Sequence, residues 1–166
     1  RAVSRGNAGG HPFGGLDHLL AMVGVGLWAL QLGGRALWAL PLGFMAALAF
    51  GGVLGMIEAP LPLVEPGVLG SLVAIGLAVA LAWRVGTAAG FAFVAAFALF
   101  HGHAHGVEMP ADAPALAYAT GFLVATGLLH AAGIGMGFAA GALGRPALPR
   151  GVGAVIAAAG VALMVG

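Results

Sequence analysis

Three histidines and a carboxylate close a long apolar run in the second half of the chain. They are His101, His103, His105 and Glu108, and the whole chain has only six histidines. Imidazole and carboxylate groups suit divalent transition metals such as Ni²⁺, Co²⁺, Zn²⁺ and Cu²⁺. If the run is helical, His101, His105 and Glu108 lie at i, i+4 and i+7 on one stripe, and His103 points elsewhere. The spacing therefore predicts a metal-binding stripe on one helix.

A second group of metal-type donors stands near the beginning of the chain. His11, Asp17 and His18 come at or before the start of the first apolar run. Asp17 is also explained as an acidic residue in a first helical turn, where the helix dipole favours negative charge, but this leaves His18 unexplained. Adjacent residues project about 100° apart on a helix, so Asp17 and His18 share a site only if the backbone bends. His11 is expected either at the metal or in a solvent-exposed loop.

His130 stands apart from both groups, near the middle of a later apolar run. Small and apolar residues surround it in the sequence. One interpretation is a neutral core histidine that bonds a backbone carbonyl. Ionisable groups inside a membrane are uncommon and usually line a path or a site. The alternative is therefore a deeper station for the ion, below the outer donors.

Composition assigns the chain to the integral membrane proteins. Of its 166 residues, 61% are hydrophobic and 7% are charged, and the mean hydropathy is +1.08. A soluble domain carries about 25% charged residues, so this chain cannot cover a water-facing surface. The net charge is only +1 and no basic run is present, so we expect no nucleic-acid partner. The absence of cysteine excludes disulfides and thiolate metal sites.

Six apolar runs predict an all-α, polytopic membrane protein, a bundle of about six transmembrane helices in one domain, 1–166. Each run is close to the ~20 residues that cross a bilayer. The expected spans are 16–32, 36–57, 68–83, 85–104, 115–142 and 152–166, after an N-terminal segment, 1–15. Glycines four residues apart, as in Gly102 and Gly106, would let another helix approach closely.

Charged residues divide between the loops by sign, and this predicts the orientation. Four arginines fall in the first, third and fifth breaks: Arg35, Arg84, Arg145 and Arg150. Four acidic residues fall in the second and fourth breaks: Glu58, Glu65, Glu108 and Asp112. The positive-inside rule places the arginine loops in the cytoplasm, so the N-terminus and both donor groups are expected on the periplasmic side. A signal peptide removed before Arg1 would explain an outward first segment.

The motifs resemble those of the HupE/UreJ family of nickel and cobalt permeases. His-Pro-x-x-Gly-Leu-Asp-His (His11 to His18) is followed by Phe-His-Gly-His-Ala-His-Gly-x-Glu (Phe100 to Glu108), and Gly133-Ile-Gly-Met follows Leu-Leu-His130. The resemblance covers nearly the whole chain. It implies uptake of Ni²⁺ or Co²⁺ across the bacterial inner membrane, often serving hydrogenase or urease maturation. Family members commonly carry an N-terminal segment with histidine, whereas residues 1–10 here hold none.

The expected function is therefore ATP-independent uptake of Ni²⁺ and/or Co²⁺ by a single transporter domain in the inner membrane. Four residues are expected to hold the ion: Asp17, His18, His101 and His105. Glu108 and His11 are expected at the entrance and His130 deeper, with His103 facing away. No Gly-rich phosphate loop is present for ATP.

Two other classes stay open. A zinc-dependent intramembrane hydrolase would also group histidine and aspartate at one membrane face, with the metal activating water. Against it, no companion acid or base is obvious, and only Ser4 and Ser71 supply serine hydroxyls. A membrane metal-binding sensor subunit would bind an ion without flux.

The expected partners are the lipid bilayer and a transported Ni²⁺ or Co²⁺ ion, with Zn²⁺ as a bound surrogate and no catalytic cofactor. The preferred metal, the coupling ion and homo-oligomer formation are left open.

Overall fold

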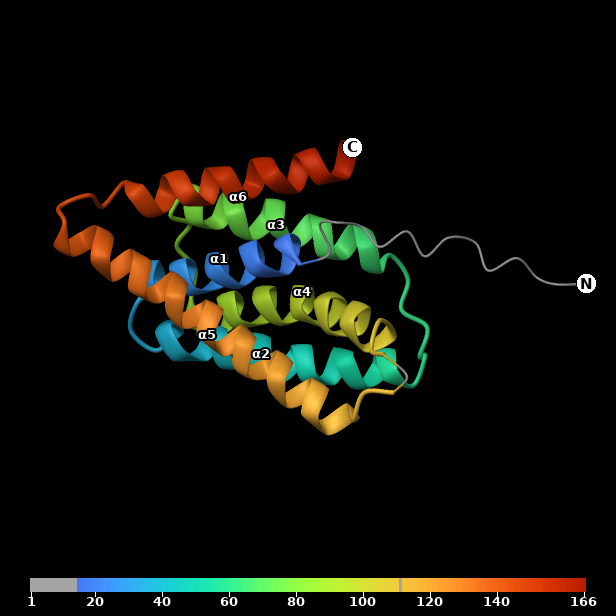
Figure 1. Ribbon diagram of the computed structural model, residues 1–166. Coiled ribbons are helices and arrows are strands. Elements are labelled where there is room, and N and C mark those ends of the chain that lie inside the picture. Colours follow the sequence, from blue (N-terminus) through green and yellow to red (C-terminus); the bar gives the residue numbers. More distant parts are fainter. Residues whose placement is uncertain (1–14, 111) are drawn as a thin grey trace, which may run out of the picture.

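The fold is all-helical and is that of a polytopic membrane protein. The computed structural model describes residues 15–110 and 112–166. Along this part of the chain six helices follow one another: α1 (Leu16–Leu32), α2 (Ala36–Met56), α3 (Val64–Ala80), α4 (Thr87–Val107), α5 (Ala115–Ala142) and α6 (Leu148–Val165) (Figure 1). The predicted fold class is confirmed.

Three helices extend beyond the expected spans. α3 begins at Val64 rather than 68, and α6 begins at Leu148 rather than 152. Pro66 and Pro149 lie in their first turns, where a missing backbone N–H costs no helical hydrogen bond. Both prolines lie outside the expected spans, 68–83 and 152–166, but each lies within a helix start. α4 continues to Val107 rather than 104, so the whole histidine stretch is helical.

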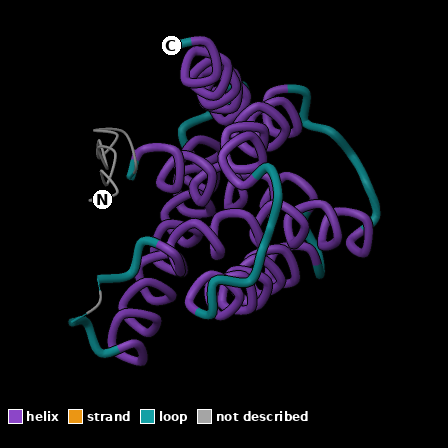
Figure 2. The backbone as a smooth tube through the Cα atoms, turned by 90° about the vertical axis from the view of Figure 1, so that its right-hand side faces the viewer, coloured by secondary structure: helices purple, strands orange, loops and turns teal. Residues whose placement is uncertain are grey.

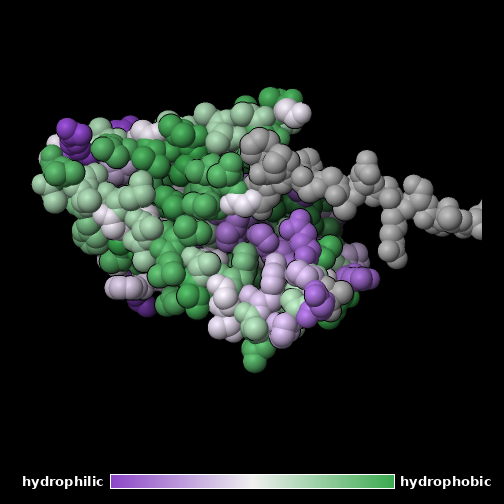
Figure 3. Space-filling model, in the orientation of Figure 1, coloured by the Kyte–Doolittle hydropathy of each residue, from purple (hydrophilic) through white to green (hydrophobic). Residues whose placement is uncertain are grey.

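The outside of the bundle is apolar, as a lipid environment requires. Large side chains such as Trp38, Phe50 and Leu116 are exposed on it. α2, α4, α5 and α6 are long and apolar enough to cross a membrane, whereas α1 and α3 are shorter apolar helices. α1 contacts every other helix and so lies at the centre. Figure 3 shows apolar side chains over the middle of the bundle and hydrophilic ones toward its ends.

Alternating helix directions bring the two predicted donor groups to one end of the bundle. The first turn of α1, the last turn of α4 and the loops after α2 and α4 all lie at the right in Figure 1. Figure 2 views the bundle from that end. Residues more than 80 positions apart in the sequence, such as His18 and His101, therefore lie at the same level along the axis of the bundle.

Close backbone contact with α2 fixes the rotation of α4 and hence the direction of its histidines. A Cβ added to Gly102 would clash with the Leu48 carbonyl and lie 2.8 Å from the Gly52 nitrogen. A Cβ on Gly106 would lie 3.0 Å from the Cα of Gly55. The predicted close approach at Gly102 and Gly106 is thus confirmed, and α2 is the helix that approaches.

Gly102→Ala should force α2 and α4 apart and lower the apparent midpoint of thermal unfolding in detergent. Overpacking of this kind costs about 1–3 kcal/mol. The matched control is Gly135→Ala in α5, because a Cβ there meets nothing within 4 Å. The control should be neutral or slightly stabilising, since alanine is the better helix former. Equal midpoints for the two variants would contradict the close contact.

Candidate metal site

Three histidine rings meet between the start of α1 and the end of α4. The ring centroid of His18 lies 5.5 Å from that of His101 and 4.9 Å from that of His105. Two imidazoles that bind one ion at about 2.0–2.1 Å have ring centroids roughly 4.5–5.5 Å apart. The rings are therefore spaced as ligands that share an ion would be.

The α4 histidines divide as their spacing predicts. His101 and His105 lie one turn apart on the side that faces His18, with His101 1% exposed and the His105 side chain 19% exposed. His103 is turned toward the loop after α2, where its Nε2 lies 2.7 Å from the carbonyl oxygen of Ala59. His103 is thus engaged by a backbone carbonyl, although part of its surface lines the cavity described next.

A cavity of about 440 Å³ opens beside the rings, and its walls carry donors from three helices. They are Asp17 of α1, Glu65 of α3, and His101, His103, His105 and Glu108 at the end of α4. Nδ1 of His105 lies 3.9 Å from Oε2 of Glu108. Three carboxylates around one mouth create a negative potential that concentrates cations. His18 is buried beside this cavity, at 7% exposure.

The donors converge but are not yet arranged as a closed coordination shell. Among residues 15–110 and 112–166, no three His, Asp or Glu side chains are already placed to hold an ion. Instead, Nε2 of His18 lies 3.2 Å from Oγ1 of Thr126, and Nε2 of His101 lies 2.7 Å from Oγ of Ser71. An ion would have to draw the remaining ring nitrogens and carboxylates together by side-chain rotation. His11, the other predicted donor, lies outside the described residues.

Comparison with known proteins gives the family. The sequence profile of the HupE / UreJ protein family matches residues 6–163. The chain belongs to the HupE/UreJ family. It is 44% identical over 156 residues to Protein HupE of Rhizobium leguminosarum bv. viciae, which covers 94% of this chain and 82% of that relative. No solved structure matches the chain. HupE/UreJ is a transporter-type family, associated with nickel and cobalt uptake for hydrogenase or urease.

Sequence reasoning missed several residues that surround the donors in this HupE/UreJ protein. Glu65 was noted only as a loop charge, although its place in an acidic loop on the same side as Glu108 was a usable signal. Ser71 and Thr126 contact the histidine rings from α3 and α5. Phe122 packs on His18 and His105, with ring centroids 4.7 Å and 4.4 Å away. No local spacing links Ser71, Thr126 or Phe122 to the histidines that they contact, so the sequence alone could not find these three.

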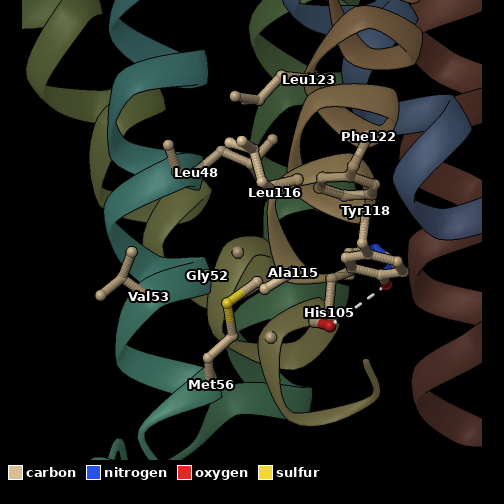
Figure 4. A pocket seen from close by; sticks show the side chains of 14 residues that line it. Leu48, Gly52, Val53, Met56, His105, Ala115, Leu116, Tyr118, Phe122 and Leu123 are labelled. Carbon is tan, nitrogen blue, oxygen red and sulfur yellow. Dashed lines mark hydrogen bonds between the residues drawn. The ribbon is translucent and has the colours of Figure 1, made fainter. Parts of the chain in front are cut away.

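A second cavity lies on the other side of His105 and is apolar. It has a volume of about 310 Å³ and lies between α2, α4 and α5 (Figure 4). Leu48, Val53 and Leu116 are among its lining residues, and the Tyr118 hydroxyl donates to the carbonyl oxygen of His105 at 3.3 Å. No carboxylate lines this apolar cavity, so it lacks the donor set of the acidic cavity beside His101.

His130 lies one turn beyond Thr126 on α5, inside the bundle. It is 2% exposed, and neither Nδ1 nor Nε2 has a hydrogen-bond partner. The Phe44 ring has its centroid 5.4 Å from that of His130 and 6.0 Å from that of His101. The interpretation of His130 as a core histidine bonded to a carbonyl is therefore wrong in this family member. A buried polar ring without a partner needs another explanation.

Proposed function

We propose that this protein takes up Ni²⁺ or Co²⁺ across the bacterial inner membrane without ATP, and that the ion first binds among the donors of α1 and α4. The observation that carries the proposal is the convergence of His18 with His101 and His105 beside an acidic cavity. Membership of the HupE/UreJ family supports the same function.

The chemistry of the cavity suits capture of a hydrated divalent cation. Asp17, Glu65 and Glu108 would attract the ion and offset its charge. Neutral imidazoles of His18, His101 and His105 would then replace part of its hydration shell, since these ligands suit borderline metals such as Ni²⁺ and Co²⁺. Selectivity between the two would follow from the geometry the rings can reach, because affinity alone follows a fixed order along the metal series.

Flux into liposomes that contain only this protein tests the proposal. Radioactive nickel should accumulate inside over time without ATP, and protein-free liposomes should not accumulate it. Binding without accumulation would favour the sensor alternative. Accumulation that requires added ATP and a second protein would contradict uptake by this chain alone.

One observation in the structure favours the hydrolase alternative, and another argues against it. Ser71 and His101 lie within hydrogen-bond distance, as a nucleophile and its base do. However, the Ser71 side chain is fully buried, and its hydroxyl lies 2.6 Å from the Val68 carbonyl, to which it donates its proton. A hydroxyl so engaged is poorly placed to attack a substrate, so Ser71 does not supply a hydrolase with a nucleophile.

The orientation that the charges predict can be tested by cysteine labelling, because the chain has no native cysteine. Asp112→Cys should react with a membrane-impermeant reagent added from the periplasmic side, and Arg145→Cys should react only after access to the cytoplasm. The physical reason is the positive-inside rule. The reverse pattern would place the cavity in the cytoplasm and would rule out uptake from this face.

A further inference from the structure

The Ser71 hydroxyl has two close partners, and their chemistry fixes where its proton goes. Oγ of Ser71 lies 2.6 Å from the carbonyl oxygen of Val68, one helical turn earlier. A carbonyl can only accept, and a serine hydroxyl has a single proton. Ser71 therefore donates that proton to Val68. The Ser71 side chain is fully buried, so solvent does not compete for it.

The second contact then has only one possible direction. Oγ of Ser71 lies 2.7 Å from Nε2 of His101. Because the serine proton is already donated, Oγ must accept, and Nε2 of His101 must carry a hydrogen. A neutral imidazole has one N–H, so the lone pair of His101 is on Nδ1. A metal-binding imidazole is neutral and coordinates through its lone pair.

We propose that Ser71 is a positioning residue that holds His101 as the Nε2–H tautomer, so that His101 binds the transported ion through Nδ1. This inference rests on the proposed function and adds to it the coordinating atom and the residue that selects it. Hydrogen bonds from the far nitrogen of a metal-binding histidine fix the ring's tautomer and orientation in general. Here the partner is a serine on a different helix, α3.

His18, on α1, also has its Nε2 atom in contact with a hydroxyl group from another helix. Its Nε2 lies 3.2 Å from Oγ1 of Thr126, while its Nδ1 is buried and without a partner. No second contact fixes the direction of this hydrogen bond as Val68 does for Ser71. If Thr126 accepts, the lone pair of His18 is on Nδ1, as in His101. Hydroxyl groups of α3 and α5 thus contact the Nε2 atoms of rings that belong to α4 and α1.

Ser71→Ala tests the inference through nickel affinity. Without the hydroxyl, Nε2–H of His101 loses its acceptor and the ring is free to change tautomer or rotate. We expect nickel affinity in equilibrium dialysis of the detergent-solubilised full chain to fall about 10–100-fold, the usual effect of removing such a partner. Ser71→Thr retains the hydroxyl and should restore most of the affinity, which a role in packing alone would not predict.

NMR of the ring nitrogens in the unaltered protein provides a second readout that does not depend on Ser71→Ala folding. In unaltered protein with isotope-labelled histidine, His101 should show a protonated Nε2 and a bare Nδ1, and added Zn²⁺ should shift the Nδ1 signal. The signals are assigned by their loss in His101→Gln. A protonated Nδ1 in His101, or a Ser71→Ala variant with unchanged affinity and spectrum, would overturn the inference.

These outcomes are separable from failure of the proposed function. If the unaltered protein bound no Ni²⁺ in dialysis, the proposed function and the metal-binding half of the inference would both fall. The tautomer of His101 would still be decided by the spectrum of the metal-free protein. If the unaltered protein bound Ni²⁺ but Ser71→Ala did so equally well, only the positioning role would fall.

Discussion

His18→Ala and His101→Ala are each expected to abolish most nickel binding, and the double variant is expected to lose little more. The two rings come from different helices and their centroids are 5.5 Å apart. If they hold one ion, removing either ring breaks the same site, so the two effects should not add. Each loss should exceed the roughly 10–100-fold effect of a residue that merely orients a ligand. Equilibrium dialysis of the three variants and the unaltered protein measures the cycle.

His103→Ala is the control for this cycle, because His103 lies on the same turn of α4 but bonds the Ala59 carbonyl. It should lower thermal stability by removing a partly buried hydrogen bond, about 0.5–1.5 kcal/mol, and leave nickel affinity within a few-fold of normal. Additive losses for His18 and His101 would mean that the two rings bind separate ions. A larger loss from His103→Ala than from either would mean that the donors on α4 are differently arranged.

The helical part of the fold was predictable because it depends on local composition. An apolar run near 20 residues has one stable arrangement in lipid, a helix whose backbone groups bond within it. Two helix starts were expected too late: Pro66 and Pro149 lie outside the expected spans, yet they occupy the first turns of α3 and α6. Proline fits a first turn and usually kinks or breaks a helix interior, although Pro41 lies inside α2, as membrane helices tolerate. The sequence alone does not say which of these applies to a given proline.

The site was predictable only where spacing along one helix determines direction. The stripe of His101 and His105 followed from the i, i+4 relation. Asp17 and His18 also separate as their 100° offset on a helix requires, with Asp17 on the cavity wall and His18 buried. Ser71 and Thr126 could not be found this way, because their contacts with His101 and His18 depend on how the helices pack.

Two of the arginines that predicted the orientation also have a local structural role. Arg84 donates to the carbonyl oxygen of Gln31 at the end of α1, and Arg150 donates to that of Ala80 at the end of α3, with Nε 2.8 Å from the oxygen. The last carbonyls of a helix lack intrahelical partners, and cations there are stabilising. Capping therefore explains part of the charge pattern without a membrane potential or a translocation signal, which is why labelling at residues 112 and 145 is a necessary test.

His130→Leu is expected to reduce nickel flux into liposomes to background while leaving nickel binding by the outer donors intact. His130 lies one turn beyond Thr126, on the membrane side of the cluster, and is the remaining histidine within the bundle in the described part of the chain. An ion that leaves His18 and His101 needs a further donor before it reaches the cytoplasm. Flux and equilibrium binding, measured on the same preparation, separate this step from capture. His130→Gln, which keeps a polar group, should retain part of the flux.

The same substitution should make the protein more stable, and this opposite sign is the stronger part of the prediction. Both ring nitrogens of His130 are buried without hydrogen-bond partners, and each unsatisfied buried group costs about 1–3 kcal/mol. Leucine has a similar volume and no polar atom, so the midpoint of thermal unfolding should rise. A residue kept at a cost to stability is expected where function needs it. Normal flux together with a raised midpoint would remove His130 from the path, whereas a lowered midpoint would show that its nitrogens have partners and that its role is structural.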